Sequence, residues 1–300
     1  MKKAIVTGGA GFIGSNLVNK LIEQGVKVTV LDNLSTGKKE NINPKAKFIQ
    51  CDISKSSTFD LMYNMKGADV IFHLAALARV QPSIEDPISF NEVNINGTLN
   101  VLFAAYKTGI KRVVYSASSS AYGNTDILPT PEDAPTNPLS PYGLQKYVGE
   151  QYCKMFSEVY GLDTVSLRYF NVYGEQMNFG GAYKTVIAVF IEQMQKGEKL
   201  NIVNGGNQRR DFTYVGDVVE ANILAASHED KLNGGVFNIG NGDNFSVNEV
   251  ADMFGGKKKY GEKRIEPFET LADNTKVQEE LGWDPQGDLA TWIKNYINNV

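Results

Sequence analysis

The chain has 300 residues, of which 42% are apolar and 21% are charged, and its formal net charge is −4. This composition is typical of a globular protein with a sizeable core, and the lack of a basic surplus argues against binding to nucleic acid. No apolar run has the length of a signal-peptide core or a membrane span, so we expect a cytoplasmic protein without a membrane partner.

The first half of the chain alternates short β-branched runs with segments of helical period. This alternation is typical of βαβ units, and it predicts the α/β fold class with a Rossmann-type, doubly wound parallel sheet. Strands are expected at Lys3–Val6, Val26–Leu31, Lys47–Gln50, Val70–Leu74, Arg112–Ser116 and Thr164–Arg168. Helices are expected at Phe12–Gln24, Phe90–Thr108 and Tyr142–Tyr160, each followed by a glycine that can adopt the left-handed cap conformation.

The second part of the chain has a different pattern. After Phe170 the alternation fades into glycine-rich segments, so we expect a smaller C-terminal substrate-binding domain. The predicted division is a Rossmann domain at residues 1–170 and a mainly substrate-binding domain at residues 171–300, with a segment near residues 211–240 that could return to the first domain. Five of the ten prolines lie between Thr125 and Pro141, which predicts a loop leading into the last helix.

A glycine-rich motif, Gly9-Ala-Gly11-Phe-Ile-Gly14, follows the first predicted strand and opens the first predicted helix. Its glycines permit a tight turn and a close approach of the backbone to a pyrophosphate, and the helix N-terminus attracts phosphates. Asp32 ends the second strand, where an acid accepts a hydrogen bond from a ribose hydroxyl and favours NAD over NADP. One alternative is a turn that binds nothing. Asp52, after the third strand, could either cap the next helix or contact the adenine.

Tyr142 and Lys146 form a Tyr-x-x-x-Lys pair downstream of the serine run Ser118–Ser120. Residues i and i+4 of a helix share one face, so the phenol and the ammonium can address the same small volume. A nearby cation favours the phenolate, which can remove a proton, and a serine hydroxyl can hydrogen-bond the same substrate oxygen. This spacing occurs by chance about once in such a chain, so its context must support a catalytic centre. The serines could also be ordinary strand-end hydroxyls.

With these motifs the chain resembles the extended short-chain dehydrogenase/reductase superfamily and, within it, the UDP-hexose 4-epimerases. Besides the glycine motif and the Ser/Tyr/Lys centre, the resemblance rests on four segments: Phe72–Ala76, Asn94–Thr98, Arg168–Gly174 and Arg209–Phe212. It implies NAD as cofactor, a UDP-sugar as substrate and a homodimer as the assembly.

The resemblance also implies which residues form the site. The equivalents of Ser118, Tyr142 and Lys146 are catalytic in the family. The expected cofactor-binding residues are Gly8, Gly11, Phe12, Ile13, Gly14, Asp32, Asn33, Asp52, Ile53, Leu74, Ala75, Ala76, Asn94, Tyr142, Lys146 and Tyr169. The expected substrate-binding residues are Ser119, Ser120, Asn171, Thr185, Val186, Arg210, Arg264 and Thr270.

Several of these positions have structural alternatives. Asn94 and Asn96 could satisfy helix backbone groups or water, and Arg210 could form an ion pair with Asp211. His73 follows an apolar strand and is expected to be packed or hydrogen-bonded rather than catalytic. The two histidines and two cysteines lack metal-ligand spacing, so no metal site is expected and both cysteines should be free thiols.

The residues beside the serine point to one type of reaction. Related nucleotide-sugar dehydratases and decarboxylases carry acidic residues in the equivalent segment, whereas here it reads Ser118-Ser-Ser-Ala-Tyr122-Gly. The resemblance therefore implies reversible oxidation at C4 of the sugar, with the hydride returned to the other face. Another nucleotide-sugar dehydratase or reductase and a non-catalytic NAD-binding protein are the alternatives.

Thr270 resembles a position that is small in epimerases accepting N-acetylhexosamines, so acceptance of UDP-GlcNAc and UDP-GalNAc beside UDP-glucose is expected. A threonine placed for packing alone is the alternative. The chain departs from the family at two places. The segment around Arg264 is one residue shorter than usual, and Ala78 stands where some epimerases have a lysine near NAD, with Arg79 as a possible substitute.

Overall fold

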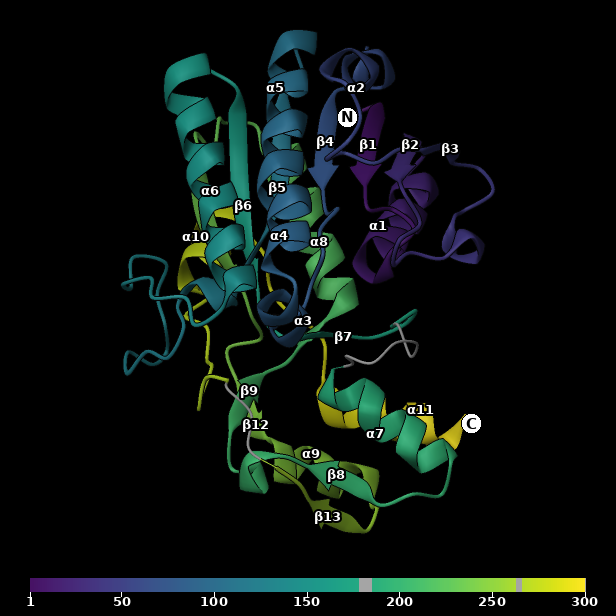
Figure 1. Cartoon of the computed structure of the whole chain (residues 1–300), viewed down its shortest axis with the longest axis vertical. Helices are drawn as coiled ribbons and strands as arrows, with labels where there is room; N and C mark the ends of the chain where they lie inside the picture. The colour runs from purple at the N-terminus through teal and green to yellow at the C-terminus, as the bar shows by residue number, and fades with distance from the viewer. Residues whose placement is uncertain (178–184, 263–265, 300) are drawn as a thin grey trace.

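The computed structural model of the protein describes residues 1–177, 185–262 and 266–299. Figure 1 shows a larger lobe built on an upright sheet, and a smaller lobe below the ends of its strands. The sheet has seven parallel strands in the order β11-β6-β5-β4-β1-β2-β3. They are β1 (Lys3–Thr7), β2 (Lys27–Asp32), β3 (Lys47–Gln50), β4 (Val70–His73), β5 (Arg112–Ser118), β6 (Asp163–Tyr169) and β11 (Gly235–Ile239).

Helices cover both faces of this sheet. One face packs against α1 (Phe12–Glu23), α8 (Val215–Ser227) and α10 (Thr275–Leu281). The other packs against α2 (Thr58–Met65), α5 (Thr98–Thr108) and α6 (Pro141–Tyr160). Side chains alternate along a strand, so Ala4 and Val6 of β1 join the first core while Ile5 joins the second. This is the doubly wound Rossmann-type arrangement that the alternation of elements predicts.

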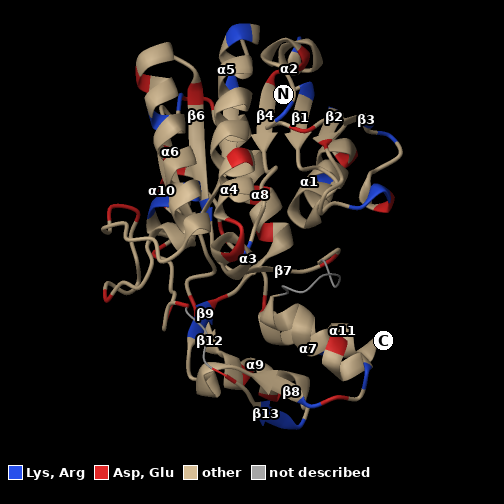
Figure 2. Ribbon diagram, in the orientation of Figure 1, with Lys and Arg blue, Asp and Glu red and all other residues tan. Residues whose placement is uncertain are grey.

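The smaller lobe has its own core between three helices, α7 (Val186–Gln195), α9 (Val247–Phe254) and α11 (Leu289–Asn298). Three strand pairs complete it: β7 (Val172–Tyr173) with β10 (Thr213–Tyr214), β8 (Leu200–Ile202) with β13 (Lys258–Tyr260), and β9 (Arg209–Asp211) with β12 (Asn244–Ser246). Figure 2 shows Lys and Arg gathered at β9 and around β13, while both signs of charge are spread over the larger lobe.

The main sheet draws elements from both sides of residue 170. Strand β11 pairs with β6 at the edge of the sheet, and α8 and α10 pack on the first core. The division into domains at that residue therefore stays a prediction, and the segment at residues 211–240 contributes to the larger lobe. No strand was predicted at Gly235–Ile239, because a five-residue strand followed by a glycine-rich turn has little sequence signal.

The segment predicted as a helix at Phe90–Thr108 is helical throughout, but it is not one uniform α-helix. The structure has a short α4 (Pro87–Asn91), a π-helical stretch at Glu92–Gly97 and then α5. A Cβ at Gly97 would lie 2.8 Å from the Ile53 side chain, so this segment packs closely against the loop after β3. The wider π turn is common at functional sites, and its Asn94 side chain is directed at the loop after β4.

Among the described residues, no helix is both long and apolar enough to cross a lipid bilayer. Both cysteines are buried free thiols, as expected.

Candidate active site

The helix that carries the predicted base begins with a defined cap. Ser140 is the N-cap of α6, and its hydroxyl accepts a hydrogen bond from the Gly143 N–H at 3.2 Å. Pro141 takes the first helical position, where its missing N–H costs nothing. The N–H of Tyr142 donates to the Ser83 hydroxyl of α3 (Val80–Glu85) at 3.1 Å. The Pro-rich loop therefore ends by fixing Tyr142 in the first turn of α6.

The turn formed by Ser118–Ser120, called the serine turn below, lies in close contact with the first turn of α6. A Cβ at Gly143 would come within 2.6 Å of the Ser120 carbonyl oxygen, so a glycine is needed for this approach. The Ser118 hydroxyl accepts a hydrogen bond from the Ser120 N–H at 3.2 Å and donates to its hydroxyl at 3.1 Å. Burial raises the pKa of the Tyr142 phenol, and the nearby Ser118 hydroxyl opposes that rise. The structure thus brings Ser118, Ser119 and Ser120 beside Tyr142.

Lys146 lies one turn further along α6, in the interior of the protein. Its ammonium donates to the Ser116 carbonyl oxygen at 2.8 Å and lies 5.0 Å above the ring of Tyr115. The Tyr115 hydroxyl donates back to the Lys146 carbonyl oxygen at 3.3 Å. Burial lowers the pKa of Lys146 to about 8. A Cβ at Gly149 would collide with the Tyr115 hydroxyl, so this second glycine allows α6 to pack closely against β5.

The environment of the Tyr142 phenol is determined first by its burial. Burial raises the pKa of Tyr142, and the Ser118 hydroxyl and the charge of Arg79 oppose that rise. The ammonium of Lys146 is directed at the Ser116 carbonyl, and its effect on the phenol stays a prediction. Gly143, Tyr115 and Gly149 were not assigned to the site from the sequence, and Arg79 was named only as a possible substitute for a lysine near NAD. For the glycines the only signal was their place inside a helix.

His73 ends β4 in the interior and is a structural residue, as predicted. Its Nδ1 lies 2.7 Å from the Thr7 hydroxyl, and its Nε2 lies 3.0 Å from the Thr98 hydroxyl. Burial lowers the pKa of His73 to about 3, so the imidazole is neutral. The Thr7 hydroxyl also accepts a hydrogen bond from the Ala75 N–H at 3.2 Å. This network holds the end of β1 against the loop that follows β4.

The predicted cofactor residues meet at the carboxyl edge of the sheet, where ligands bind in doubly wound folds. Gly8, Gly11, Phe12, Ile13 and Gly14 follow β1; Asp32 and Asn33 lie at the end of β2; Asp52 and Ile53 follow β3; and Leu74, Ala75 and Ala76 follow β4. A cavity of about 220 Å³ opens at this edge, and it is lined by Ala10, Gly11, Phe12, Thr36, Lys38, Asn41, Gln176 and Met177.

This edge fits a dinucleotide. Gly11 caps α1 without any side-chain hydrogen bond, which leaves the helix N-terminus available to a phosphate. Asp32 is buried, and its carboxylate accepts the N–H groups of Ala10 at 3.0 Å and Leu34 at 2.8 Å. These bonds place a carboxylate at the end of β2 while two of its lone pairs stay open to a ribose hydroxyl. NAD would be held by this glycine loop and Asp32.

Three other predicted cofactor residues have protein partners. Asp52 accepts from the Ser54 N–H at 3.0 Å, and Ser57 caps α2, so the suggestion that Asp52 caps the next helix was wrong. Asn33 donates to Asp52 at 3.2 Å. The Tyr169 hydroxyl bonds Ser116 and Asn222, at 3.0 and 2.8 Å. Contacts of Asn33, Asp52 and Tyr169 with the cofactor stay predictions.

Asn94 holds the loop after β4. Its amide accepts from the Leu77 N–H and donates to the Leu77 carbonyl and to Gln145, each at 2.9 Å. Both amide protons are therefore used within the protein, on a loop carbonyl and a side chain and not on helix backbone. Asn96 donates instead to Glu92 at 2.8 Å. A cofactor contact of Asn94 stays a prediction.

On the substrate side, Asn171 and Thr270 lie together. The Asn171 amide donates to the Asp211 carbonyl at 2.8 Å and to the Thr270 hydroxyl at 3.3 Å. The Asp211 carboxylate accepts hydrogen bonds from the backbone N–H groups of Asn241, Gly242 and Ala272. These bonds connect β9 to the residues that follow β11 and to the segment beside Thr270. Burial raises the pKa of Asp211 to about 6.

Arg210 does not pair with Asp211, so that alternative was wrong. Its guanidinium donates to the Glu266 carboxylate at 2.8 Å, and to the carbonyl oxygens of Arg209 and Phe268. A phosphate contact of Arg210 stays a prediction, and Arg264 lies outside the described residues. Thr185 is the N-cap of α7, where its hydroxyl accepts the Ala188 N–H, and Val186 is the first residue of that helix.

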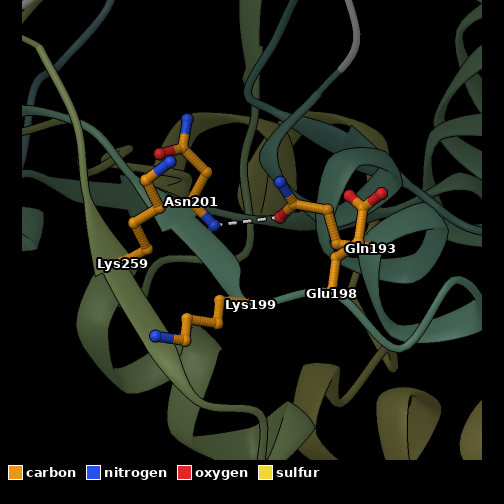
Figure 3. Close-up of a pocket in the computed structure, with 5 residues that line it drawn as sticks. All are labelled: Gln193, Glu198, Lys199, Asn201 and Lys259. Carbon is orange, nitrogen blue, oxygen red and sulfur yellow. Dashed lines mark hydrogen bonds between the residues drawn. The ribbon is translucent and has the colours of Figure 1, made fainter.

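A second hollow lies away from these residues, at the edge of the smaller lobe. Figure 3 shows it between α7, β8 and β13, with Asn201 donating its N–H to the Gln193 side chain at 2.9 Å. The hollow measures about 400 Å³, and Glu198, Lys199 and Lys259 complete its lining. None of the predicted site residues contributes to its lining.

The model of the NAD dependent epimerase/dehydratase family matches residues 4–240 of the chain. The chain belongs to this family. A UDP-glucose 4-epimerase from Mycolicibacterium smegmatis is 36% identical, over 98% of this chain and 97% of its own length. The epimerase/dehydratase fold extends over the whole chain, because two solved structures superpose on nearly all of it.

The first is a UDP-glucose 4-epimerase from Thermotoga maritima with UDP-glucose. It has a TM-score of 0.92 and 38% identity over 99% of each chain. The second is a UDP-N-acetylglucosamine 4-epimerase from Methanobrevibacter ruminantium M1 in complex with UDP-N-acetylmuramic acid. It has a TM-score of 0.92 and 36% identity, and covers 100% of this chain and 99% of its own. Both similarities support the resemblance to UDP-hexose 4-epimerases seen in the sequence.

Proposed function

We propose that this member of the NAD dependent epimerase/dehydratase family is a 4-epimerase of UDP-hexoses. It interconverts UDP-glucose with UDP-galactose and UDP-GlcNAc with UDP-GalNAc, by oxidation at C4 and return of the hydride. The epimerase relatives support this substrate class, because they carry the names of UDP-glucose and UDP-N-acetylglucosamine 4-epimerases.

The observation that carries the proposal is the contact between the serine turn and the first turn of α6. In this contact the Ser120 carbonyl approaches Gly143, the residue after Tyr142, and the Ser118 hydroxyl donates to the Ser120 hydroxyl in the same turn. No carboxylate stands between Ser118 and Tyr122 to drive the extra proton transfers of a dehydration. The proposed role of Tyr142 is to remove the proton of the C4 hydroxyl and to give it back, while Ser118 hydrogen-bonds the same oxygen.

The remaining roles follow from position. Bound NAD supplies the acceptor of the C4 hydride and its donor on return. The Lys146 ammonium donates to the Ser116 carbonyl and provides a positive charge one helical turn after Tyr142. Asn171 and Thr270 line the sugar end of the site through their shared hydrogen bond.

Proton NMR of purified protein with UDP-glucose or UDP-GlcNAc, and no added reductant, tests the proposal. Inversion at C4 without accumulation of NADH is expected. A 4-keto-6-deoxy product would favour a dehydratase, and steady consumption of NADH would favour a one-way reductase. No change in either sugar would favour a non-catalytic NAD-binding protein.

The choice of sugar depends on Thr270. A larger side chain at this position removes the space for an acetamido group, so Thr270→Tyr is expected to lower kcat/KM for UDP-GlcNAc about ten- to a hundredfold, and to spare UDP-glucose. Thr270→Ser keeps both the hydroxyl partner of Asn171 and the space, and should retain both activities. Equal loss with the two sugars in the tyrosine variant would contradict this role.

The protein is also proposed to act in the cytoplasm as a homodimer, with α5 and α6 at the interface. These helices lie side by side in front of the sheet (Figure 1). They expose the aromatic residues Phe103, Tyr106 and Tyr160, at 36 to 40% of their surface, and the rings of Tyr106 and Tyr160 lie 5.0 Å apart. Exposed aromatic clusters are frequent at interfaces.

Light scattering tests the dimer. Tyr106→Glu is expected to halve the measured mass, because it places a charge inside the proposed interface. Phe59→Glu is the matched control, since Phe59 is an exposed aromatic residue of α2 and lies outside that interface. A monomeric native protein, or an equal effect of both substitutions, would contradict the proposed interface.

A further inference from the structure

A short segment at residues 174–177, called the connecting segment below, follows β7 and lies where the two lobes meet. Its residues Gln176 and Met177 line the cofactor cavity of about 220 Å³, together with Gly11 and Phe12 of the glycine loop. Figure 1 shows β7 between the main sheet and the helix pair α7 and α11. One wall of the cofactor cavity therefore comes from the part of the chain that the sequence assigned to substrate binding.

The backbone of the connecting segment has an unusual conformation. Gly174 has φ at 139°, and a Cβ there would collide with the Val215 side chain, so glycine is needed. Gln176 has φ at 63°, in the left-handed region that a residue with a side chain rarely adopts. Such a conformation costs energy and persists only where the surrounding structure imposes it. Contacts from both lobes impose it here.

On the side of the larger lobe, the first two turns of α1 hold the connecting segment. The Ser15 hydroxyl is buried and donates to the Gln176 side-chain oxygen at 2.7 Å. The Asn16 side-chain amide donates to the Glu175 carbonyl oxygen at 2.9 Å. Phe12 adds an apolar contact, because its side chain packs against the core of the smaller lobe. The connecting segment is thus fixed to the same helix whose N-terminus would bind the phosphates of NAD.

On the side of the smaller lobe, the Glu175 carboxylate accepts hydrogen bonds from two aromatic residues. One oxygen accepts the Nε1–H of Trp292 in α11, and the other accepts the hydroxyl of Tyr214 in β10, each at 2.8 Å. The rings of Trp292 and Tyr214 lie 5.4 and 5.8 Å from the ring of the buried Tyr173. Burial and the bond to Glu175 raise the pKa of Tyr214 to about 12, so its hydroxyl remains a donor at neutral pH.

These contacts form one continuous bridge from α1, through the backbone and side chain of Glu175, to α11. The described lining of the cofactor cavity includes Gln176 but not Glu175. The position of the cavity wall therefore depends on a residue that lies outside the cavity. Without the bonds of the Glu175 carboxylate, the strained conformation of Gln176 loses part of its support, and the wall can relax away from the cofactor.

We propose that Glu175 is a positioning residue for the cofactor. It holds Gln176 and Met177 as a wall that contacts NAD and slows its release. The inference rests on NAD as the cofactor and not on the sugar that reacts. The release of NAD can be measured without any sugar, so a failure of this inference is distinguishable from a failure of the proposed epimerase activity.

The sign of the effect separates this role from a simple effect of charge. A carboxylate repels the phosphates of a nearby dinucleotide, so removal of the Glu175 charge alone would slow the release of NAD. Loss of the bridge acts in the opposite direction, because the wall then contributes fewer contacts to the bound cofactor. Differences in affinity between closely related complexes lie mostly in the dissociation rate.

Glu175→Ala tests the proposal in the NAD-loaded enzyme. It removes both acceptors of the carboxylate and retains the backbone carbonyl that Asn16 holds. Both lost bonds are exposed to solvent, so the release of NAD should become faster by a modest factor, about three- to tenfold. The measurement is the NAD absorbance that the protein retains at intervals after transfer to NAD-free buffer. Release at the native rate, or more slowly, would overturn the proposal.

Three further variants locate the effect. Glu175→Gln retains one acceptor oxygen and should release NAD at an intermediate rate. Trp292→Phe keeps an aromatic ring and removes one donor to Glu175, so it should also accelerate release. Asp252→Ala is the matched control: it removes an exposed carboxylate of α9 that pairs with Lys258, and NAD release should be unchanged. Equal acceleration in Asp252→Ala would show that Glu175 has no specific role.

The melting temperature separates positioning of the cofactor from a purely structural role. A bound ligand stabilises the native state by an amount that grows with the ratio of its concentration to its Kd. The rise in melting temperature caused by a fixed concentration of NAD should therefore be smaller in Glu175→Ala than in the native protein. An equal rise in both proteins, with a lower melting temperature of the variant in the absence of NAD, would mean that Glu175 only stabilises the fold, against the proposal.

Discussion

Replacement of Tyr142 with phenylalanine is expected to lower kcat about a thousandfold, as loss of a general base does. The hydroxyl is the group that takes the proton of the substrate, and neither Ser118 nor Lys146 can replace it. The serine is not a base at neutral pH, and the ammonium is bound to the Ser116 carbonyl. The measurement is the rate of C4 inversion under saturating UDP-sugar.

The fold should survive this change. The bond that anchors Tyr142 to Ser83 uses the backbone N–H, which phenylalanine retains. The NAD content and melting temperature are therefore expected to match those of the native protein. Tyr147→Phe makes the same chemical change on the same helix and should keep full activity. A Tyr142→Phe enzyme with more than about a tenth of the native rate would contradict general-base catalysis by this residue.

Replacement of Gly14 with alanine is expected to remove most of the bound NAD and to destabilise the fold by about 1–3 kcal/mol. A Cβ at Gly14 would collide with the Gly8 carbonyl oxygen and lie 2.9 Å from the Gly9 Cα. Both are backbone atoms of the glycine loop, so no side-chain rotation can relieve the collision. The first turn of α1 must then move away from the loop that would hold the pyrophosphate.

Two other glycines give a graded comparison. A Cβ at Gly11 would lie 3.2 Å from the Gly8 carbonyl, so Gly11→Ala should weaken NAD retention with a smaller loss of stability. At Gly261 the nearest atom is the Asn201 side-chain oxygen, at 2.9 Å, which can rotate away, and Gly261→Ala should change neither property. NAD absorbance after denaturation and urea melts provide the data. Native NAD content in Gly14→Ala would contradict the role of this loop.

Much of the fold was predictable because its signals are local. The six predicted strands are present with ends that differ by at most two residues, since each is a short β-branched run bounded by turns. The long helix carrying Tyr142 and Lys146 begins within one residue of its predicted start, because Pro141 marks the first turn. The assignment of His73 to the interior was also confirmed.

Other features were missed because they arise between segments far apart in the chain. The π turn around Asn94 lies where Gly97 packs closely against Ile53, which is distant in the sequence. The carboxylate partner of Arg210 is Glu266, and nothing in the sequence around Arg210 favours Glu266 over the adjacent Asp211 as that partner. Strand β11 can be recognised only from its pairing with β6 in the folded sheet.

The sequence by itself determined the motifs whose spacing is set by one turn or one helix. The glycine loop, the pair Tyr142 and Lys146, and the absence of a carboxylate after Ser118 are all of this kind. The tertiary structure decided how deeply the phenol is buried and where the ammonium is held. The ammonium of Lys146 is directed at a strand carbonyl, and burial raises the pKa of Tyr142. Electrostatic effects depend on distance through space and on burial, and neither can be read from residue spacing.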